Sequence, residues 1–434
     1  MKSSSTPHGA WVALALLAGI NFMNYYDRLL VVVVSQPLRL EFNMTDTQYG
    51  LLTGPAFVFV YAVASLLFGL LADRQNRRRL IGVAVGLWSA MTALCGMAGS
   101  FPMLALARAG IGVGEGGANP AGMSLLSDHF PAQKRSMALA LFQVGGMFGM
   151  LASFMLASWI TTKYDWRTTF LVAAVPGLLL AAATFFFMPE PKRGQQGEAA
   201  SAPLPFFKTL GVLWQNKAYR WLSAAASFGV FSSLGMLIWL PQFFIRMHGM
   251  DQSHVGFLFG PAAALGLIAG MLLGGVLGNT AARHSLASPV RICIAANLLL
   301  APVLLTVLWI PSTNIALIAC FVGMALAVIY APAFQATMQS VCKPEQRGTA
   351  GACSNVLNAI IGQGLIPLFV GALSDALMPT HGIESLRLAL TASVGFTVIS
   401  GLLFIVAYLT TRKQFGTNAD PAVTPAGAIP AAIK

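Results

Sequence analysis

The sequence predicts an all-α membrane protein with twelve transmembrane helices in two six-helix bundles. Three observations predict this fold class: 56% of the 434 residues are hydrophobic and only 9% are charged, long apolar runs recur along the chain, and one polar stretch divides these runs into two groups. A soluble domain carries roughly one quarter charged residues. A helix needs about 20 apolar residues to cross a bilayer, which fits the length of the runs.

Six apolar runs precede the polar stretch and six follow it. The runs lie near 11–35, 49–72, 80–100, 102–126, 136–160 and 168–188, and then near 220–245, 254–278, 289–310, 313–340, 349–375 and 386–410. The segment between them is rich in Pro, Gly, Gln and Ser, as is typical of a linker. We therefore predict an N-terminal bundle at 1–188, a cytoplasmic linker at 189–218, a C-terminal bundle at 219–412, and a disordered cytoplasmic tail at 413–434.

The positions of the positive charges predict the orientation. With both termini in the cytoplasm, 19 of the 26 Lys and Arg residues lie on that side and five on the outer side. Cytoplasmic loops of membrane proteins carry this excess, so the net charge of +12 indicates no nucleic-acid partner. The short loops and tails favour a multi-pass protein of a bacterial inner membrane, and we expect it to act as a monomer.

Signatures of other function classes are missing from the sequence. The five cysteines lie mostly in apolar stretches without CxxC or Cys/His spacing, so we interpret them as buried small side chains and expect no metal site. There is no G-x-x-x-x-G-K-[ST] segment that would hold a nucleotide phosphate, and we expect no cofactor. An integral-membrane enzyme would need a nucleophile or histidine cluster, so it is the less favoured alternative to a transporter.

Four charged residues lie inside predicted helices. Asp27 and Arg28 are in the middle of the first helix, and Arg108 and Glu115 are two turns apart on one face of the fourth. A charge at the centre of a bilayer costs about 3 kcal/mol or more, so its presence indicates a function. We interpret the arginines as the binding site for an anionic substrate and the carboxylates as proton carriers. A purely structural ion-pair network is the alternative.

Aromatic and amide side chains are candidate substrate contacts. Tyr25 and Tyr61 are candidate walls of a central cavity, although aromatic residues also pack between helices. Asn355 and Asn358 are i, i+3 neighbours on the eleventh predicted helix, so both amides lie on one face. They could donate hydrogen bonds to the substrate or to a neighbouring helix.

The segment GLLADRQNRRR (69–79) lies between the second and third predicted helices. Gly69 permits two helices to approach closely, and Asp73 can accept positive charge or cap a neighbouring helix. Together with Arg74, Arg77 and Arg78, these residues could form a latch that exists in only one conformation. The alternative is a solvated basic loop. A shorter match, GVLGNTAAR (275–283), follows the eighth helix and indicates that the two halves are repeats.

The same segment resembles the G-x-x-x-D-R-x-x-R-R signature of the major facilitator superfamily, and the resemblance extends over nearly the whole chain. NYYDR (24–28), RAGIGVGEGGANP (108–120), SDHFPAQKR (127–135) and DWRTTF (165–170) resemble the bacterial spinster-like group. The same positions also resemble the organic anion:proton symporters that take up sugar acids. The resemblance implies that Asp27 and Glu115 are the protonated pair and that Arg28 and Arg108 contact the anion.

We therefore expect a secondary active transporter that works by alternating access. Its substrate would be an organic anion of the carboxylate or sugar-acid type, coupled to protons. The alternative is a spinster-like transporter of a lysolipid or another amphiphilic lipid, in which the arginines bind a phosphate and the aromatic walls accept the tail.

Overall fold

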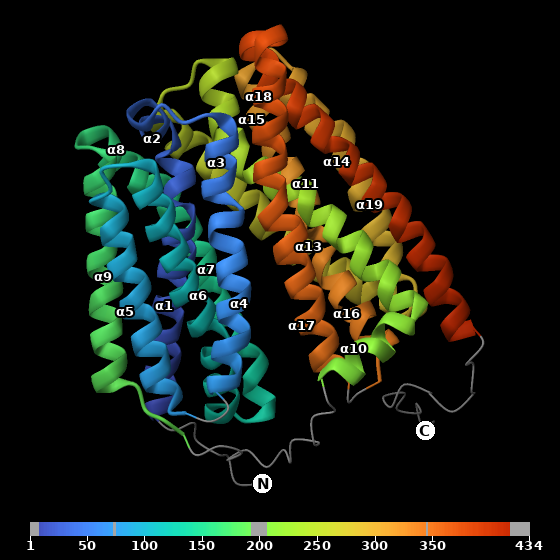
Figure 1. Ribbon diagram of the computed structural model, residues 1–434. Coiled ribbons are helices and arrows are strands. Elements are labelled where there is room, and N and C mark those ends of the chain that lie inside the picture. Colours follow the sequence, from blue (N-terminus) through green and yellow to red (C-terminus); the bar gives the residue numbers. More distant parts are fainter. Residues whose placement is uncertain (1–7, 73–74, 192–205, 344–345, 417–434) are drawn as a thin grey trace, which may run out of the picture.

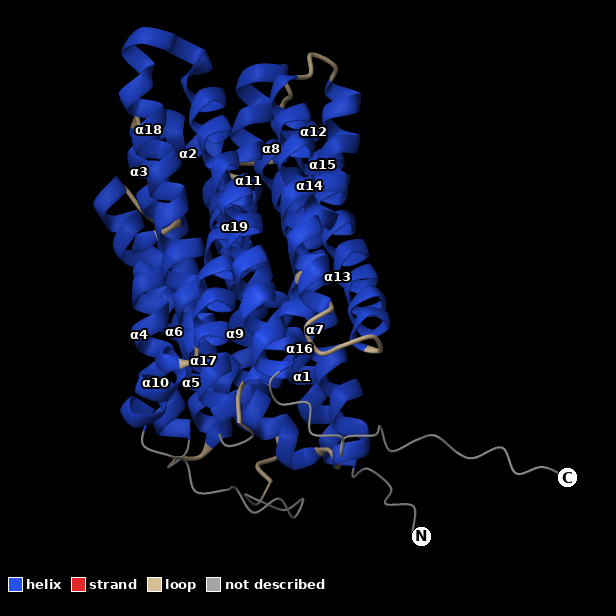
Figure 2. Ribbon diagram, turned by 90° about the vertical axis from the view of Figure 1, so that its right-hand side faces the viewer, coloured by secondary structure: helices blue, strands red, loops and turns tan. Residues whose placement is uncertain are grey.

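The computed structural model describes residues 8–72, 75–191, 206–343 and 346–416, and this part of the chain is almost entirely helical (Figures 1 and 2). No strand occurs within these ranges. A helix satisfies its backbone hydrogen bonds within its own segment, which a chain in lipid requires because no water is present. The predicted all-α class is confirmed.

Ten helical elements are described in the first half of the chain, within residues 8–72 and 75–187. They are α1 (His8–Val33), α2 (Ser35–Phe42), α3 (Asp46–Thr53), α4 (Pro55–Ala72), α5 (Arg77–Gly96), α6 (Phe101–His129), α7 (Ala132–Ala152), the π-helical turn η1 (Ser153–Ala157), α8 (Ser158–Lys163) and α9 (Trp166–Phe187). The first predicted apolar run therefore ends in α2, and the second is divided between α3 and α4.

The second half is more often interrupted. Its elements are α10 (Phe206–Gln215), α11 (Lys217–His248), α12 (Gln252–His254), η2 (Val255–Phe259), α13 (Gly260–Ala282), α14 (Pro289–Trp309), α15 (Thr313–Ile329), α16 (Ala331–Val341), α17 (Arg347–Leu357), the π-helical η4 (Asn358–Leu365), α18 (Ile366–His381), η5 (Gly382–Glu384) and α19 (Ser385–Gly416). The π-helical segment η4 separates α17 from α18 within a single predicted run, and a π-helical turn in a helix often marks a functional site.

Nine helical segments in the described ranges are long and apolar enough to cross a membrane, so the predicted number of twelve is not confirmed. The difference has two sources. One segment, at 349–415, merges the last two predicted runs. In addition, α1 and α6 are not among the nine, although they have 26 and 29 residues. Asp27 and Arg28 in α1 and Arg108 and Glu115 in α6 lower the mean hydropathy of these two helices.

Local signals explain where several helices begin. Thr45 caps α3, because its hydroxyl accepts a hydrogen bond from the Gln48 amide while the Gln48 side chain accepts one from the Thr45 amide. Pro55 then starts α4, as expected of a residue suited to the first turn of a helix. Asn76 caps α5 through a 3.0 Å bond from the Arg79 amide.

The helices form two groups that follow the two halves of the sequence (Figure 1). We call the end that holds His8 and Gly416 the terminal end and the end that holds Asp46 and Asp375 the opposite end. Contacts between the halves are concentrated at the opposite end, where α3 packs against α18 and η1 against η2. The halves are therefore joined at one end of the molecule.

Helices extend into both the predicted linker and the predicted tail. The predicted linker at 189–218 contains the helix α10, and α11 begins at Lys217. The last helix, α19, continues to Gly416, within the predicted tail at 413–434. The predictions for 192–205 and for 417–434 fall outside the described residues.

Candidate functional site

Arg28 and Glu115 form an ion pair between α1 and α6. Arg28 donates to Oε2 of Glu115 from Nη2 at 2.8 Å and from Nε at 3.2 Å. The Glu115 side chain is fully buried, whereas 22% of the Arg28 side chain remains exposed. Charge-assisted hydrogen bonds of this kind are strong inside a protein, and Arg28 also lines a cavity between the two halves.

Asp27 and Arg108 are both buried and do not pair with each other. The Arg108 guanidinium donates to the backbone carbonyls of Asp27 at 3.3 Å and of Arg28 at 2.7 Å. The Thr92 hydroxyl donates to Oδ2 of the Asp27 carboxyl at 3.5 Å. Within the described ranges, Asp27 has no ion pair and its Oδ1 has no hydrogen-bond partner. Burying a carboxylate without a charged partner is costly.

Aromatic rings surround the two arginines. The Arg28 guanidinium lies 5.2 Å from the ring centres of Phe57 and Tyr61 and 5.7 Å from that of Tyr25, and Arg108 lies 4.6 Å from Phe57. Such distances are within the range of cation–π attraction. Close packing of α4 on α6 brings Phe57 and Tyr61 there, since a Cβ at Gly116 would lie 2.8 Å from the Tyr61 carbonyl oxygen.

A cavity of about 420 Å³ lies between the two halves beside Arg28. Its polar lining comes from both halves: Tyr25, Arg28, Tyr61 and Asn119 from the first, and Ser233, Tyr330, Asn355, Asn358 and Gln363 from the second. This volume is in the usual range for a small-molecule site. The cavity continues toward the terminal end into a second one of about 370 Å³ that shares Tyr61, Asn119 and Asn355 with it.

Five of the predicted site residues meet at this cavity: Tyr25, Arg28, Tyr61, Asn355 and Asn358. Glu115 lies behind Arg28, and Asp27 is buried beside Thr92. Arg108 lines a small neighbouring cavity of about 60 Å³, together with Arg28 and Phe57. Asn358 also accepts a 3.0 Å hydrogen bond from Ser227 on α11. Its side chain therefore bonds to a neighbouring helix and also lines the cavity.

Asn119 and Phe57 were not among the predicted site residues. Asn119 is four residues after Glu115 on α6, so the helical period places both on one face. That spacing could have identified it. Phe57 is an ordinary apolar residue in an apolar helix, and its position under the two arginines becomes evident only from the packing of α4 against α6.

The predicted latch is described only in part, because Asp73 and Arg74 lie outside the described residues. Gly69 has open space around it. Arg77 is buried and donates to Asp128 at 2.5 Å, to Ser124 at 3.1 Å and to Glu190 at 3.0 Å. The Arg78 amide binds the other Glu190 oxygen at 2.7 Å. These contacts join α5 to α6 and to the start of the linker.

A second charged cluster joins the two halves at the opposite end. Asp46 is paired with Arg39 at 2.5 Å and with Arg246 of the second half at 2.6 Å, and it accepts a 2.6 Å bond from Ser374. Asp375 accepts from the amides of Asp46 and Thr47 at 3.0 and 2.8 Å. Arg39 and Arg246 are two of the five basic residues expected on the outer side, and the sequence did not predict that they meet at Asp46.

A family model of the major facilitator superfamily matches residues 17–367. The chain belongs to this superfamily. An MFS-type efflux pump of Mycolicibacterium smegmatis is 28% identical over 92% of both chains. Protein spinster of Drosophila melanogaster is 28% identical over 94% of this chain and 70% of its own length. The sphingosine-1-phosphate transporter SPNS2 of Danio rerio is 24% identical over 92% of this chain and 84% of its own length.

The fold of this chain is also similar to that of a protein of known structure. The crystal structure of a bacterial homologue of the human lysosomal transporter spinster, in an inward-facing and unoccupied conformation, superposes with a TM-score of 0.87 at 26% identity, over 95% of this chain and 99% of that one. The occupied form of that homologue gives a TM-score of 0.83 at 25% identity, over 95% and 99% of the two chains. The predicted resemblance to spinster-like transporters is confirmed, and the chain is a multi-pass membrane transporter rather than an enzyme.

Proposed function

We propose that this protein moves an organic anion across the membrane by alternating access, coupled to protons. One observation carries the proposal: Arg28 contributes to the wall of the central cavity while its guanidinium is also bound to the buried Glu115. An arginine fork matches the geometry of a carboxylate or a phosphate. Tyr25, Tyr61, Asn355 and Asn358 are the proposed neighbouring contacts, and Arg108 is proposed to act beside Arg28.

Proton coupling follows from competition for Arg28. An anion that binds the guanidinium weakens its bonds to Glu115, and a buried carboxylate without its partner favours the neutral form. Proton uptake by Glu115 would then accompany anion binding. Asp27 is the second proposed proton carrier, because it is buried and has no ion pair within the described ranges. Occupancy and protonation would thus be linked.

The direction of opening supports alternating access. The cavity extends toward the terminal end, whereas the Asp46 cluster joins the halves at the opposite end. Because positive charge collects in the loops of the terminal end, we propose that this end is cytoplasmic, in a bacterial inner membrane, and that the protein acts as a monomer. Residues 1–188 and 219–412 would rock as two bodies, with Gly69, Asp73, Arg74, Arg77 and Arg78 as a latch.

A lysolipid or another anionic amphiphile is the second candidate substrate. SPNS2 of Danio rerio, a relative over 92% of this chain, is named as a transporter of sphingosine-1-phosphate. A phosphate could bind Arg28 in the same way as a carboxylate. The rings of Tyr25 and Tyr61 would contact the apolar part of such a molecule.

Uptake into proteoliposomes under an imposed pH gradient tests the proposal. Sugar acids, aromatic acids and lysophospholipids are offered in turn, and the expected result is accumulation of at least one anion that collapses when the gradient is removed with an ionophore. Accumulation of a cationic or neutral compound, with no response to any of the anions, would overturn the proposal.

A further inference from the structure

Two neighbouring helices of the second half, α14 and α19, each expose an apolar stripe (Figure 1). The stripe on α14 includes Leu298, Leu305 and Trp309, and the stripe on α19 includes Leu402 and Leu409. These residues recur at spacings of four or seven, so those on one helix share one face. Both helices belong to segments that are apolar enough to cross a membrane. The two stripes are therefore surfaces that face lipid.

Each stripe ends in an exposed arginine at the terminal end. Arg291 is seven residues before Leu298 on α14, and Arg412 is three residues after Leu409 on α19, so each arginine continues the stripe of its helix. Arg291 and Trp309 are 18 residues apart. At about 1.5 Å per residue this is roughly 27 Å, close to the hydrocarbon thickness of about 30 Å. Arg291 therefore lies at the level of the lipid head groups.

Tyr408 joins the two helices beside these arginines. Arg291 donates to the Tyr408 hydroxyl from Nε at 3.2 Å and from Nη2 at 2.7 Å, and its guanidinium lies 5.2 Å from the centre of the Tyr408 ring. Because the oxygen accepts both bonds, the hydroxyl proton remains to be donated. Arg412 is four residues after Tyr408, so the two are neighbours on the surface of α19. Two guanidinium groups and one O–H donor thus lie together at head-group level.

The positive charge of this cluster has no carboxylate beside it among the described residues. At the terminal end of the second half, Asp and Glu are absent from the described segments 206–222, 275–295, 330–343, 346–347 and 403–416. The opposite end of the same helix pair differs, because Arg387 on α19 is paired there with Glu384 at 2.6 Å. The charge of Arg291 and Arg412 is therefore left for an anion from outside the protein.

We propose that α14 and α19 hold an anionic phospholipid of the surrounding bilayer, with its phosphate at Arg291, Tyr408 and Arg412 and its acyl chains along the two apolar stripes. Guanidinium groups donate strong charge-assisted hydrogen bonds to phosphate oxygens. A zwitterionic lipid is disfavoured, because its positive head group meets two arginines and no carboxylate. The lipid is a resident partner on the outer face of the second half, separate from the cavity at Arg28 and from any transported substrate.

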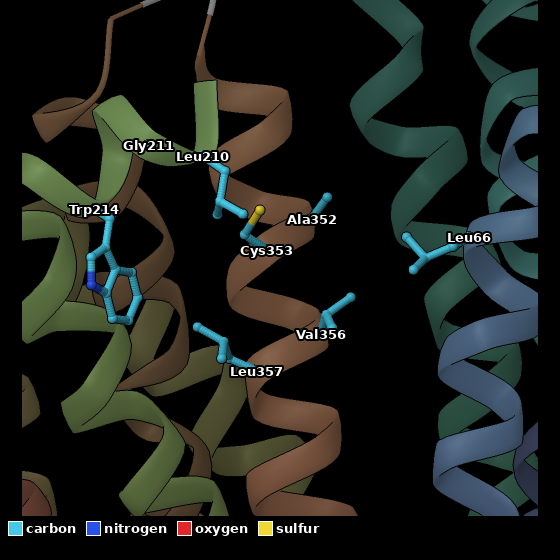
Figure 3. A pocket seen from close by; sticks show the side chains of 8 residues that line it. All are labelled: Leu66, Leu210, Gly211, Trp214, Ala352, Cys353, Val356 and Leu357. Atoms are coloured by element: carbon cyan, nitrogen blue, oxygen red, sulfur yellow. The ribbon is translucent and has the colours of Figure 1, made fainter. Parts of the chain in front are cut away.

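A lipid chain has a second possible place in the interior of the protein. An apolar pocket of about 660 Å³ lies between α4, α10 and α17, with Leu66 on one side and Leu210 and Trp214 on the other (Figure 3). Gly211 lies in its wall, and a Cβ there would have no heavy atom within 4 Å. Gly211→Leu therefore adds a side chain at this pocket without touching α14 or α19, and it separates the two places.

Native mass spectrometry of the full-length protein measures binding of dioleoyl phosphatidylglycerol, which is anionic, and dioleoyl phosphatidylcholine, which is zwitterionic and has the same chains. The wild type should prefer phosphatidylglycerol by about fivefold or more. Arg291→Ala should weaken phosphatidylglycerol binding by about tenfold and remove most of this preference, and Tyr408→Phe should weaken it by about threefold. Arg79→Ala is the matched control, because Arg79 is an exposed arginine at the terminal end of the first half. It should bind both lipids like the wild type.

Three outcomes would overturn the proposal. Wild-type binding of phosphatidylglycerol in both Arg291→Ala and Tyr408→Phe would remove the cluster from lipid binding; the tyrosine variant keeps its ring, so it does not depend on the fold tolerating loss of the arginine. Weakening by Gly211→Leu but not by Arg291→Ala would place the lipid in the interior pocket. Displacement of phosphatidylglycerol by excess inorganic phosphate would mean that the cluster binds free phosphate and that the acyl chains contribute nothing.

Discussion

Arg28 donates two hydrogen bonds to the same oxygen of Glu115, at 2.8 and 3.2 Å, and leaves the other oxygen without a partner among the described residues. The pair joins α1 to α6 at the wall of the central cavity. Any anion that binds the exposed part of Arg28 must share the guanidinium with Glu115. The proposed coupling of substrate binding to proton binding would therefore act at this pair.

Arg28→Lys should weaken anion binding by about tenfold or more. Lysine keeps the charge but cannot make the planar two-point contact with a carboxylate or phosphate. Binding of a transported anion to purified protein measures the effect. Arg291→Lys is the control, because Arg291 is a surface residue that bonds to the Tyr408 hydroxyl away from the cavity. Wild-type affinity in Arg28→Lys would remove Arg28 from the site.

Asp46→Asn should loosen the contact between the halves at the opposite end. The substitution preserves shape but removes the charge that holds Arg39 and Arg246 at 2.5 and 2.6 Å. The two arginines would then repel each other without compensation, which favours separation of the halves. Spin labels at Leu40 and Ile383, both exposed, would report longer distances in the variant.

Glu41→Gln is the matched control for that measurement. Glu41 also forms an ion pair at this end, but its partner Arg167 belongs to the same half. Its loss should leave the distance between the labels unchanged. Identical distance distributions in the wild type and in Asp46→Asn would show that the Asp46 cluster does not hold the halves together.

Arg77→Ala should lower thermal stability. Its guanidinium is buried and binds Asp128, Ser124 and Glu190, so its removal leaves two carboxylates without their cation. A loss of about 2 kcal/mol is expected, which should lower the melting temperature of the purified protein by about 5 °C. Arg79→Ala, at an exposed neighbouring position, should melt like the wild type. A wild-type melting temperature in Arg77→Ala would contradict a structural role for this cluster.

The charged residues inside helices could be predicted from the sequence, because a charge in an apolar helix is costly and therefore conspicuous. The sequence could not pair them: Arg28 binds Glu115, whereas Arg108 binds backbone carbonyls. The Asp46 cluster gave no such signal. A charge at a helix end is inexpensive, and the partners Asp46 and Arg246 are 200 residues apart in the chain.

The positions at which the helices are interrupted could not be predicted from the apolar runs alone. Hydropathy over 49–72 is continuous, but α3 ends at Thr53 and α4 begins at Pro55, so the run is divided between two helices. Likewise, α10 is a short helix of ten residues in a segment that composition alone indicates as linker. Its packing beside α11 and α17, rather than its own propensity, accounts for it.

The most direct test of proton coupling compares accumulation and exchange in the same proteoliposomes for the wild type, Glu115→Gln and Asp27→Asn. Glutamine imitates protonated Glu115 but cannot release a proton. We expect Glu115→Gln to abolish accumulation driven by a pH gradient while exchange of labelled for unlabelled anion continues, and Asp27→Asn to behave similarly. Full pH-driven accumulation by both variants would contradict proton coupling through Glu115 and Asp27 and reduce the four charged residues to a structural network.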